Sequence, residues 1–270
     1  MSVKNAYLPI VETMTYEVQI DTTQTFDDTN TDITETSYEE LFSLETEIQW
    51  VMTNYGRSVI ARILLEVTTL PSSGTLSLRS TICGKTAETT AIALTGQIKQ
   101  FIEINENDID GSESLTCLVE GLNSAGSQES TIGSAEVTYS FGTTETDPDE
   151  MATLVYIGLN NIIEDLFGEL WADTLKSVEM VSYTGLAYTF DEDSDTVYVG
   201  FESDEKLYDY SDTDEVDIDA FISPPYAGNY LGIYGATSDA ANPMLIAGLT
   251  IKFKVTAINY NNNNPIRQIR

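Results

Sequence analysis

The sequence contains no histidine and only two cysteines, Cys83 and Cys117. Without histidine, neither a Ser-His-Asp triad nor a Cys-His pair can form, and zinc held through imidazole is excluded. The two cysteines do not form a CxxC redox motif. They fall in separate predicted strands, where they either pair with each other or remain buried thiols. We therefore predict a protein that is not an enzyme and requires no cofactor.

Long apolar runs are also missing from the chain. No segment approaches the roughly 18 consecutive apolar residues that a membrane-spanning helix needs. The N-terminal sequence MSVKNAYLPIVET lacks the apolar core of a signal peptide. We expect no insertion into a membrane. The expected location is a virion or an extracellular surface, reached by assembly inside the cell.

Basic residues are scarce, because 12 lysines and arginines stand against 44 acids and the net charge is −32. Residues 1–142 carry 21 of the acids and residues 151–270 carry 19, so the acidity belongs to the whole surface. Nucleic acid is excluded as a direct partner, since phosphate binding needs clustered bases. An anionic membrane surface is disfavoured for the same reason.

Such a charge repels itself in dilute buffer. Two hypotheses account for it: a halophilic protein, in which salt screens the repulsion, or an ordinary acidic extracellular or virion protein. The Debye length falls to about 3 Å at 1 M salt, where most of the repulsion disappears. We expect the melting temperature to rise from low to molar salt. A flat response in thermal denaturation would contradict the halophilic hypothesis.

The first half of the chain shows alternation of apolar and polar residues with a period of two, which is typical of half-buried strands. Glycine, proline, serine, asparagine and aspartate stand at the breaks, so an antiparallel sandwich or barrel of about eight strands is predicted, most simply a jelly roll. Residues 21–40, rich in threonine and acids, are expected to form a solvated loop. The alternating runs cover residues 15–20, 44–50, 61–67, 76–82, 89–94, 97–104, 115–122 and 134–141.

The last two of these runs, LTCLVEGLNSAGS and GSAEVTYSF, resemble the closing hairpin of viral jelly-roll modules in capsid, decoration and fibre proteins. They also resemble carbohydrate-binding modules. The resemblance covers about residues 15–141 and implies a homo-oligomer that contacts other virion proteins.

An acidic stretch at residues 143–150, within GTTETDPDE, separates this first unit from a second one with a different pattern. Apolar residues at helical spacing predict an amphipathic helix from Asn161 to Leu175. Strands are expected on both sides of it. We predict a jelly-roll-like β-sandwich at 1–142, an acidic linker at 143–150, and a smaller β-rich α+β domain with one helix at 151–270.

One acidic turn in the second unit resembles the calcium loop of EF-hands, with carboxylates at positions 1, 3, 5 and 12. Thr196 replaces the glycine of position 6, and strands are predicted where an EF-hand has helices. Calcium is therefore a candidate ligand of the turn, and a solvated acidic face is the alternative. The four carboxylates are those of Asp191, Asp193, Asp195 and Glu202.

Two other segments are candidate contact surfaces. Tyr226, Tyr230 and Tyr234 recur every four residues in a glycine- and proline-rich stretch, where they either stack on glycans or protein partners or anchor the stretch to the core. The last 21 residues contain no acid, and their bases are predicted to form an assembly arm; a frayed terminus is the alternative. These bases are Lys252, Lys254, Arg267 and Arg270.

These features favour a non-enzymatic virion structural protein, such as a capsid-decoration, fibre or tail-associated subunit, that acts through protein–protein assembly and receptor attachment. The alternatives are a glycan-binding surface module, for which Trp50 is a further stacking candidate, and a subunit of an extracellular filament or surface layer. A carboxylate-pair glycosidase needs no histidine either, but no pair of acids stands out by its local context.

Overall fold

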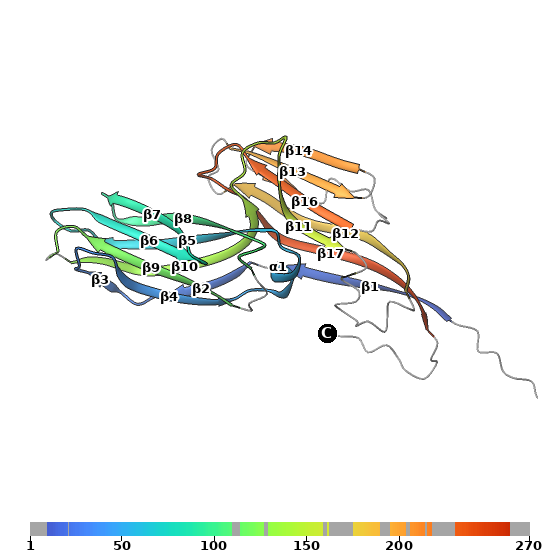
Figure 1. Cartoon of the computed structure of the whole chain (residues 1–270), viewed down its shortest axis with the longest axis horizontal. Helices are drawn as coiled ribbons and strands as arrows, with labels where there is room; N and C mark the ends of the chain where they lie inside the picture. The colour runs from blue at the N-terminus through green and yellow to red at the C-terminus, as the bar shows by residue number, and fades with distance from the viewer. Residues whose placement is uncertain are drawn as a thin grey trace, which may run out of the picture.

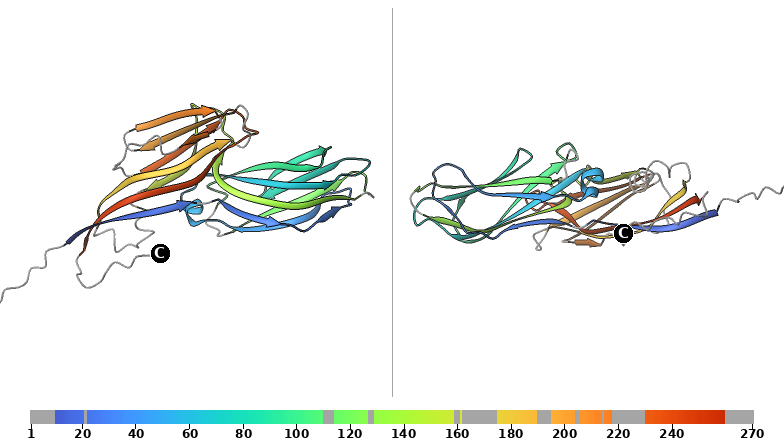
Figure 2. Two further views of the ribbon diagram at one scale, coloured as in Figure 1. Left: turned by 180° about the vertical axis from the view of Figure 1, so that it is seen from behind. Right: turned by 90° about the horizontal axis from the view of Figure 1, so that it is seen from below.

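The architecture is mainly β, as predicted, and the described residues form three antiparallel sheets (Figure 1). The computed structural model describes residues 10–20, 22–109, 114–126, 129–158, 161, 175–189, 195–203, 206–213, 215–217 and 230–259. One nine-stranded sheet extends through both lobes of the elongated molecule, and two four-stranded sheets pack against its opposite ends (Figures 1 and 2).

The first lobe is a jelly roll. We count its strands along the chain from one to eight, with β2 and β3 together as the first. One layer then has the order first–eighth–third–sixth (β2/β3-β10-β5-β8). The other layer has the order second–seventh–fourth–fifth (β4-β9-β6-β7). This is the order of two Greek keys folded into a jelly roll, so the prediction is confirmed. The strands are β2 (Thr23–Asp27), β3 (Thr31–Ile33), β4 (Glu39–Glu47), β5 (Ser58–Thr69), β6 (Leu76–Ile82), β7 (Lys85–Ile92), β8 (Gly96–Asn105), β9 (Ser114–Asn123) and β10 (Ser130–Thr143).

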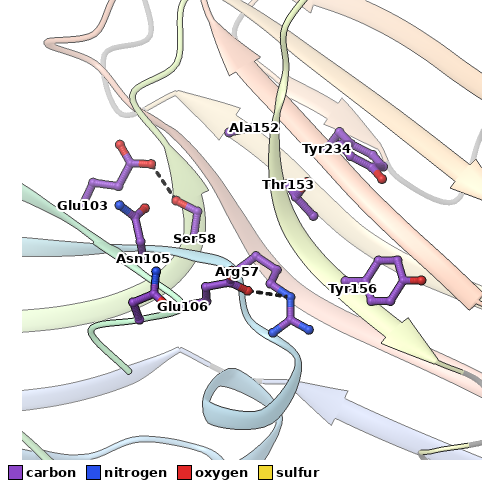
Figure 3. A pocket seen from close by; sticks show the side chains of 10 residues that line it. Arg57, Ser58, Glu103, Asn105, Glu106, Ala152, Thr153, Tyr156 and Tyr234 are labelled. Carbon is purple, nitrogen blue, oxygen red and sulfur yellow. Dashed lines mark hydrogen bonds and ion pairs between the residues drawn. The ribbon is translucent and has the colours of Figure 1, made fainter. Parts of the chain in front are cut away.

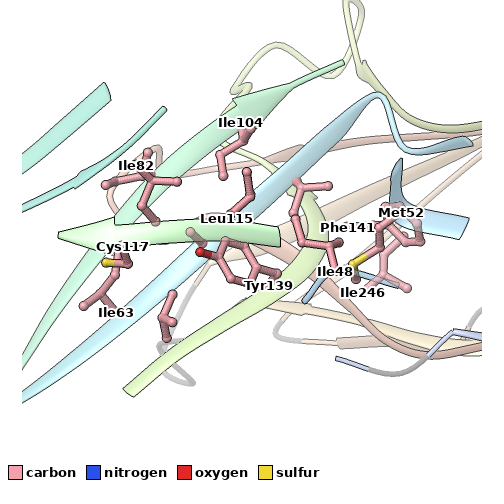
Figure 4. Packing of buried hydrophobic residues seen from close by; sticks show 14 of the residues in the cluster. Ile48, Met52, Ile63, Ile82, Ile104, Leu115, Cys117, Tyr139, Phe141 and Ile246 are labelled. Atoms are coloured by element: carbon pink, nitrogen blue, oxygen red, sulfur yellow. The ribbon is translucent and has the colours of Figure 1, made fainter. Parts of the chain in front are cut away.

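Alternation along the strands explains the core between these two layers. In β5, Ala61, Ile63 and Leu65 are fully buried, whereas Arg62 lies half-buried on the other face. Tyr139 lies among these apolar side chains (Figure 4). Period-two burial of this kind is what an antiparallel strand with one face on the core requires.

The two cysteines of this lobe do not pair. Cys117 lies in the core on β9, and burial raises the pKa of its thiol to about 12. Cys83 is exposed in the two-residue turn between β6 and β7, where it and Gly84 both have positive φ angles, as a type I′ hairpin turn requires.

The prediction of a solvated loop at residues 21–40 is wrong. This segment contains β2 and β3, and both pair with β10. Threonine fits a strand because its branched side chain packs well on a pleated surface. In β2, Thr23 and Thr25 alternate with Gln24 and Phe26, which was a strand signal of low hydrophobicity.

The second lobe packs the sheet β11-β16-β13-β14 against the other end of the nine-stranded sheet, where β12 and β17 lie side by side. Its strands are β1 (Ile10–Ile20), β11 (Ala152–Gly158), β12 (Leu175–Thr189), β13 (Thr196–Ser203), β14 (Lys206–Thr213), β15 (Glu215–Asp217), β16 (Tyr230–Thr237) and β17 (Met244–Asn259). The sequence assigned β1 to the first unit, but β1 pairs with β17 along its whole length.

The described part of the chain contains few helical residues. The helix α1 (Trp50–Tyr55) lies where the sequence predicted the end of a strand, and its residues Val51, Met52 and Tyr55 are buried against the core. Of the predicted helix, Asn161 is helical and residues 162–174 lie outside the described residues. Leu175, its predicted last residue, is the first residue of β12.

The predicted linker begins inside a strand. Gly142 and Thr143 are the last residues of β10 and pair with Leu245 and Met244 of β17. Beyond them the backbone N–H of Thr237 donates to the carbonyl oxygen of Glu145 (2.8 Å). The two predicted units thus share one sheet, and their division at residues 143–150 stays a prediction.

Candidate ligand-binding cleft and open strand edge

A cleft of about 660 Å³ lies where the jelly roll meets the sheet of the second lobe (Figure 3). One wall comes from the start of β5 and the end of β8, and the other comes from β11 and β16. The backbone joins these walls directly, since the Arg57 N–H donates to the Leu154 carbonyl oxygen at 2.8 Å. The cleft is lined by Arg57, Ser58, Glu103, Asn105, Glu106, Asn107, Ala152, Thr153, Tyr156 and Tyr234.

Tyrosines form the wall contributed by the second lobe. The ring of Tyr156, which is 37% exposed, stacks on Tyr230 with centroids 5.2 Å apart and an interplanar angle of 24°. Gly232, the residue directly opposite Tyr156 on β16, has no side chain, and the ring of Tyr234 occupies that space. A Cβ at Gly232 would lie 2.7 Å from this ring. The three tyrosines therefore gather on one face of the sheet.

Charged and amide groups form the wall contributed by the jelly roll. The Arg57 Nε lies 3.0 Å from Glu106 Oε2, and its guanidinium lies 5.9 Å from the centroid of the Tyr156 ring (Figure 3). Asn105 and Asn107 are exposed beside them. This wall thus offers planar donors and acceptors that face an aromatic surface.

The turn that presents these groups is held in place by Asp108. Its carboxylate accepts the Asn105 N–H (2.9 Å) and pairs with Lys85, whose Nζ also donates to the Glu103 carbonyl oxygen (3.0 Å). The hydrogen bond from Lys85 lowers the pKa of Asp108 below its ordinary value. The stability that Asp108 gives to the turn is therefore fully present when the pH is above the ordinary pKa of an aspartate, and it is lost as the pH falls through the lowered pKa of Asp108.

Glu103 ties the floor of the cleft to the start of the predicted linker. Its carboxylate accepts hydrogen bonds from the Ser58 hydroxyl (2.7 Å), from the Thr143 hydroxyl (3.2 Å) and from the Thr144 N–H (3.2 Å). A carboxylate that accepts several bonds has a fixed orientation. Glu103 is therefore a structural member of the cleft, in contrast to the exposed Glu106.

Two of the three predicted tyrosines belong to this region. Tyr230 and Tyr234 lie on β16, and Tyr226 lies outside the described residues. Trp50 lies in α1. Sequence reasoning missed Arg57 and Tyr156, because they come from segments far from β16 and become neighbours only when the sheets pack. The spacing of the tyrosines was the one available signal.

The predicted calcium turn lies partly outside the described residues, which include neither Asp191 nor Asp193. Glu202 lies in β13. Both carboxylate oxygens of Asp195 accept hydrogen bonds, one from Asn242 Nδ2 (2.8 Å) and one from the Ser238 hydroxyl (3.3 Å). Within the described ranges, no cluster of three potential metal ligands occurs. Calcium binding stays a prediction.

The predicted basic arm begins inside a strand. Lys252 and Lys254 lie on β17, at register positions opposite Glu17 of β1 and Glu179 of β12, respectively. Arg267 and Arg270 lie outside the described residues. At these positions the two lysines are placed to offset acids of their own sheet, and a role in assembly stays a prediction.

Residues 51–102 are locally basic, with five bases against two acids, and ion pairs explain most of these bases. Four of its five bases pair with acids that lie later in the jelly roll. The pairs are Arg57–Glu106, Arg62–Glu136, Arg79–Glu120 and Lys85–Asp108. This segment therefore serves the fold of its own lobe.

A second feature of functional interest is the edge formed by β1. This strand pairs with β17 over eleven consecutive positions without a register shift. Among the described residues, no strand pairs with its other edge.

The described residues contain no helix that is long and apolar enough to span a bilayer.

Comparison with known proteins gives a likeness in structure alone. No protein-family model and no curated protein sequence match the chain. The VP2 subviral particle of infectious bursal disease virus is 12% identical, with 91% of this chain and 42% of that chain covered and a TM-score of 0.27. The Gx strain of the same virus gives 11% identity, 94% and 45% coverage and a TM-score of 0.25.

A protein of Parabacteroides distasonis described as secreted gives 10% identity, 90% and 88% coverage and a TM-score of 0.25. The chain spans less than half the length of the two viral chains. Likeness at this level concerns β architecture and carries no information about function.

Proposed function

We propose that this protein is a non-enzymatic structural subunit of a virus particle, as a capsid-decoration, fibre or tail-associated protein. It acts by assembling with further copies of itself and with other virion proteins. The observation that carries the proposal is the edge of β1, an eleven-residue strand at the margin of the long sheet with which no further described strand pairs (Figure 1).

Edge strands of monomeric proteins are usually protected from pairing with other chains by charged side chains, above all lysine, or by proline, bulges or short length. The sequence of β1, IVETMTYEVQI, contains neither lysine nor proline, its only charged residues are Glu12 and Glu17, and its pairing with β17 has no bulge. Its many β-branched residues favour an extended conformation. The strand thus has the properties of an edge that accepts another strand.

A second copy of the same strand fits this edge. Antiparallel pairing about a two-fold axis at Thr15 places Glu12 opposite Val18 and Glu17 opposite Thr13 of the other copy. No two acids then face each other, and like charges directly opposite would be destabilising. A self-complementary strand is what a two-fold interface needs, because both copies use the same surface.

One further feature supports the proposal, and the charge of the chain sets the condition under which assembly is expected. The jelly-roll order of the first lobe occurs in viral capsid and lectin domains, which is an analogy at the level of the fold. The net charge of −32 opposes the association of copies in dilute buffer. Assembly is therefore expected to strengthen at molar salt, where charges are screened.

Disulfide trapping tests the proposed interface. In a Cys83→Ser background, Thr15→Cys places two cysteines directly opposite each other, with Cα atoms roughly 4.5 to 5.5 Å apart, within disulfide reach. We expect a cross-linked dimer on oxidation at molar salt. Gln19→Cys is the matched control, because the same register separates its two copies by roughly 26 Å. Equal cross-linking of the two variants would contradict the register.

Mass photometry and the neighbouring genes test assembly itself. A wild-type chain that stays strictly monomeric at high concentration and molar salt would contradict the proposal. Capsid, portal or tail genes beside this reading frame are expected. A position within a metabolic operon would argue against a virion protein.

A further inference from the structure

We propose that the cleft between the jelly roll and the second lobe binds a neutral oligosaccharide. Tyr156 and Tyr234 provide the surface on which a sugar ring stacks, and Arg57, Asn105 and Glu106 bond its hydroxyls. The cleft is independent of the β1 edge, so a failure of either proposal leaves the other standing.

The aromatic wall has the shape that a sugar ring needs. Sugars present one face of C–H groups, and this face packs on the flat surface of an aromatic ring. Tyr230 stacks on Tyr156 at 5.2 Å and fixes the orientation of that ring. Tyr230 itself does not line the cleft. It is a positioning residue behind the platform.

Gly232 makes this wall continuous. Because the glycine has no side chain, the Tyr234 ring lies over the backbone of β16 instead of standing away from it. Tyr156 and Tyr234 thereby line the cleft as neighbours on adjacent strands (Figure 3). A platform of two rings has the extent for more than one sugar unit.

The opposite wall provides the hydrogen bonds. Sugar hydroxyls donate and accept at once, so they are recognised by carboxylate, amide and guanidinium groups placed side by side. Arg57 and Glu106 have side chains that are 33% and 52% exposed, and two exposed asparagines flank them. Lys85 and Asp108 hold this turn in place, so its groups are preorganised for a ligand.

Charge decides in favour of a neutral ligand. Glu103 and Glu106 outnumber Arg57 in the cleft, within a chain of net charge −32, so phosphate and sialic acid are repelled. A cation would have to compete with protein groups, since Glu106 pairs with Arg57 at 3.0 Å, Glu103 accepts several hydrogen bonds, and the Arg57 guanidinium lies 5.9 Å from the centroid of the Tyr156 ring. The volume of about 660 Å³ is typical of small-ligand sites.

The test uses the full chain at molar salt on an array of neutral and sialylated oligosaccharides, followed by calorimetry with each neutral saccharide that binds. We expect a neutral oligosaccharide to bind with a Kd of about 1 mM or tighter. Tyr156→Ala should weaken this binding at least tenfold. Tyr156→Phe should keep it within about threefold, because stacking needs the ring and not the hydroxyl.

Tyr198→Ala is the matched control, since Tyr198 lies on β13 of the same sheet and does not line the cleft. The affinity of Tyr198→Ala for the saccharide should equal that of the wild type. Circular dichroism should show that Tyr156→Ala, Tyr156→Phe and Tyr198→Ala are all folded. Absence of any neutral ligand, binding of sialylated saccharides alone, or equal affinities of Tyr156→Ala and the wild type would each overturn the proposal.

Discussion

Replacing Gly142 by alanine is expected to lower the free energy of unfolding by about 3 kcal/mol. Gly142 lies opposite Leu245, at the three-residue pairing where β10 of the jelly roll meets β17 of the second lobe. An added Cβ would lie well inside van der Waals contact of the Met244 carbonyl oxygen and 3.0 Å from the Ile60 side chain. A backbone oxygen cannot rotate away, so the two strands must separate.

The consequence extends beyond one contact, because β10 belongs to both lobes. Tyr139 and Phe141, immediately before Gly142, are core residues of the jelly roll, and Leu245 and Ile246 are buried on the other side of the junction. Loosening of this pairing should make the lobes unfold in separate steps. The wild type is expected to unfold in one step.

Gly133→Ala is the matched control for this substitution. Gly133 lies on the same strand, and an added Cβ there meets the end of the Thr68 side chain, which can rotate. We expect a loss below about 1 kcal/mol. Urea denaturation of the wild type and both variants at molar salt provides the comparison. Equal stabilities of the two alanine variants would refute the role assigned to the junction.

The jelly roll was predictable from the sequence because its strands alternate clearly. Every second residue is apolar from Val59 to Val67 in β5 and from Ala135 to Phe141 in β10, and those residues form the core. These signals are local, so they can be recognised without knowing which strand is the partner. The turn between β6 and β7 was not predicted, because Cys83 was assigned to a strand, whereas Cys83 and Gly84 form the turn between Ile82 and Lys85.

Strand pairing across long distances could not be predicted. The alternation in Ile10–Ile20 indicates a strand but contains no information that its partner is Leu249–Asn259, near the other end of the chain. The segment Thr23–Asp27 gave a weak signal, because threonine and acids are as typical of loops as of edge strands. Its contact with β10 decided the outcome.

The residues of the cleft were difficult to predict for the same reason, because they depend on contacts between distant segments. Tyr230 and Tyr234 were found by their spacing, whereas Arg57, Glu106 and Tyr156 are single residues in ordinary surroundings. Tyr156 follows the alternation of β11 and differs from a solvent-facing strand residue only through its neighbours. Binding sites that arise where two sheets meet depend on the packing, which alternation does not specify.

Asn123→Ala is expected to lower the free energy of unfolding by about 2 to 4 kcal/mol. Asn123, the last residue of β9, is fully buried. Its Nδ2 donates to the Ile33 carbonyl oxygen and to the Ser130 hydroxyl, both at 3.2 Å, and its Oδ1 accepts the Ala125 N–H at 3.1 Å. Alanine leaves these buried groups without the amide, and each unmade bond costs about 1 to 3 kcal/mol.

The position of Asn123 makes this loss cooperative. One amide connects β3, the turn after β9 and the first residue of β10, which are the elements that close the jelly roll at this end. Asn105→Ala is the matched control, because Asn105 is likewise the last residue of a strand, β8, and is exposed. Urea denaturation should show a large loss for the first variant alone, together with faster hydrogen exchange at Ala125. A loss of the same size for both variants would mean that strand ends in general, and not the buried amide, determine the stability of this end.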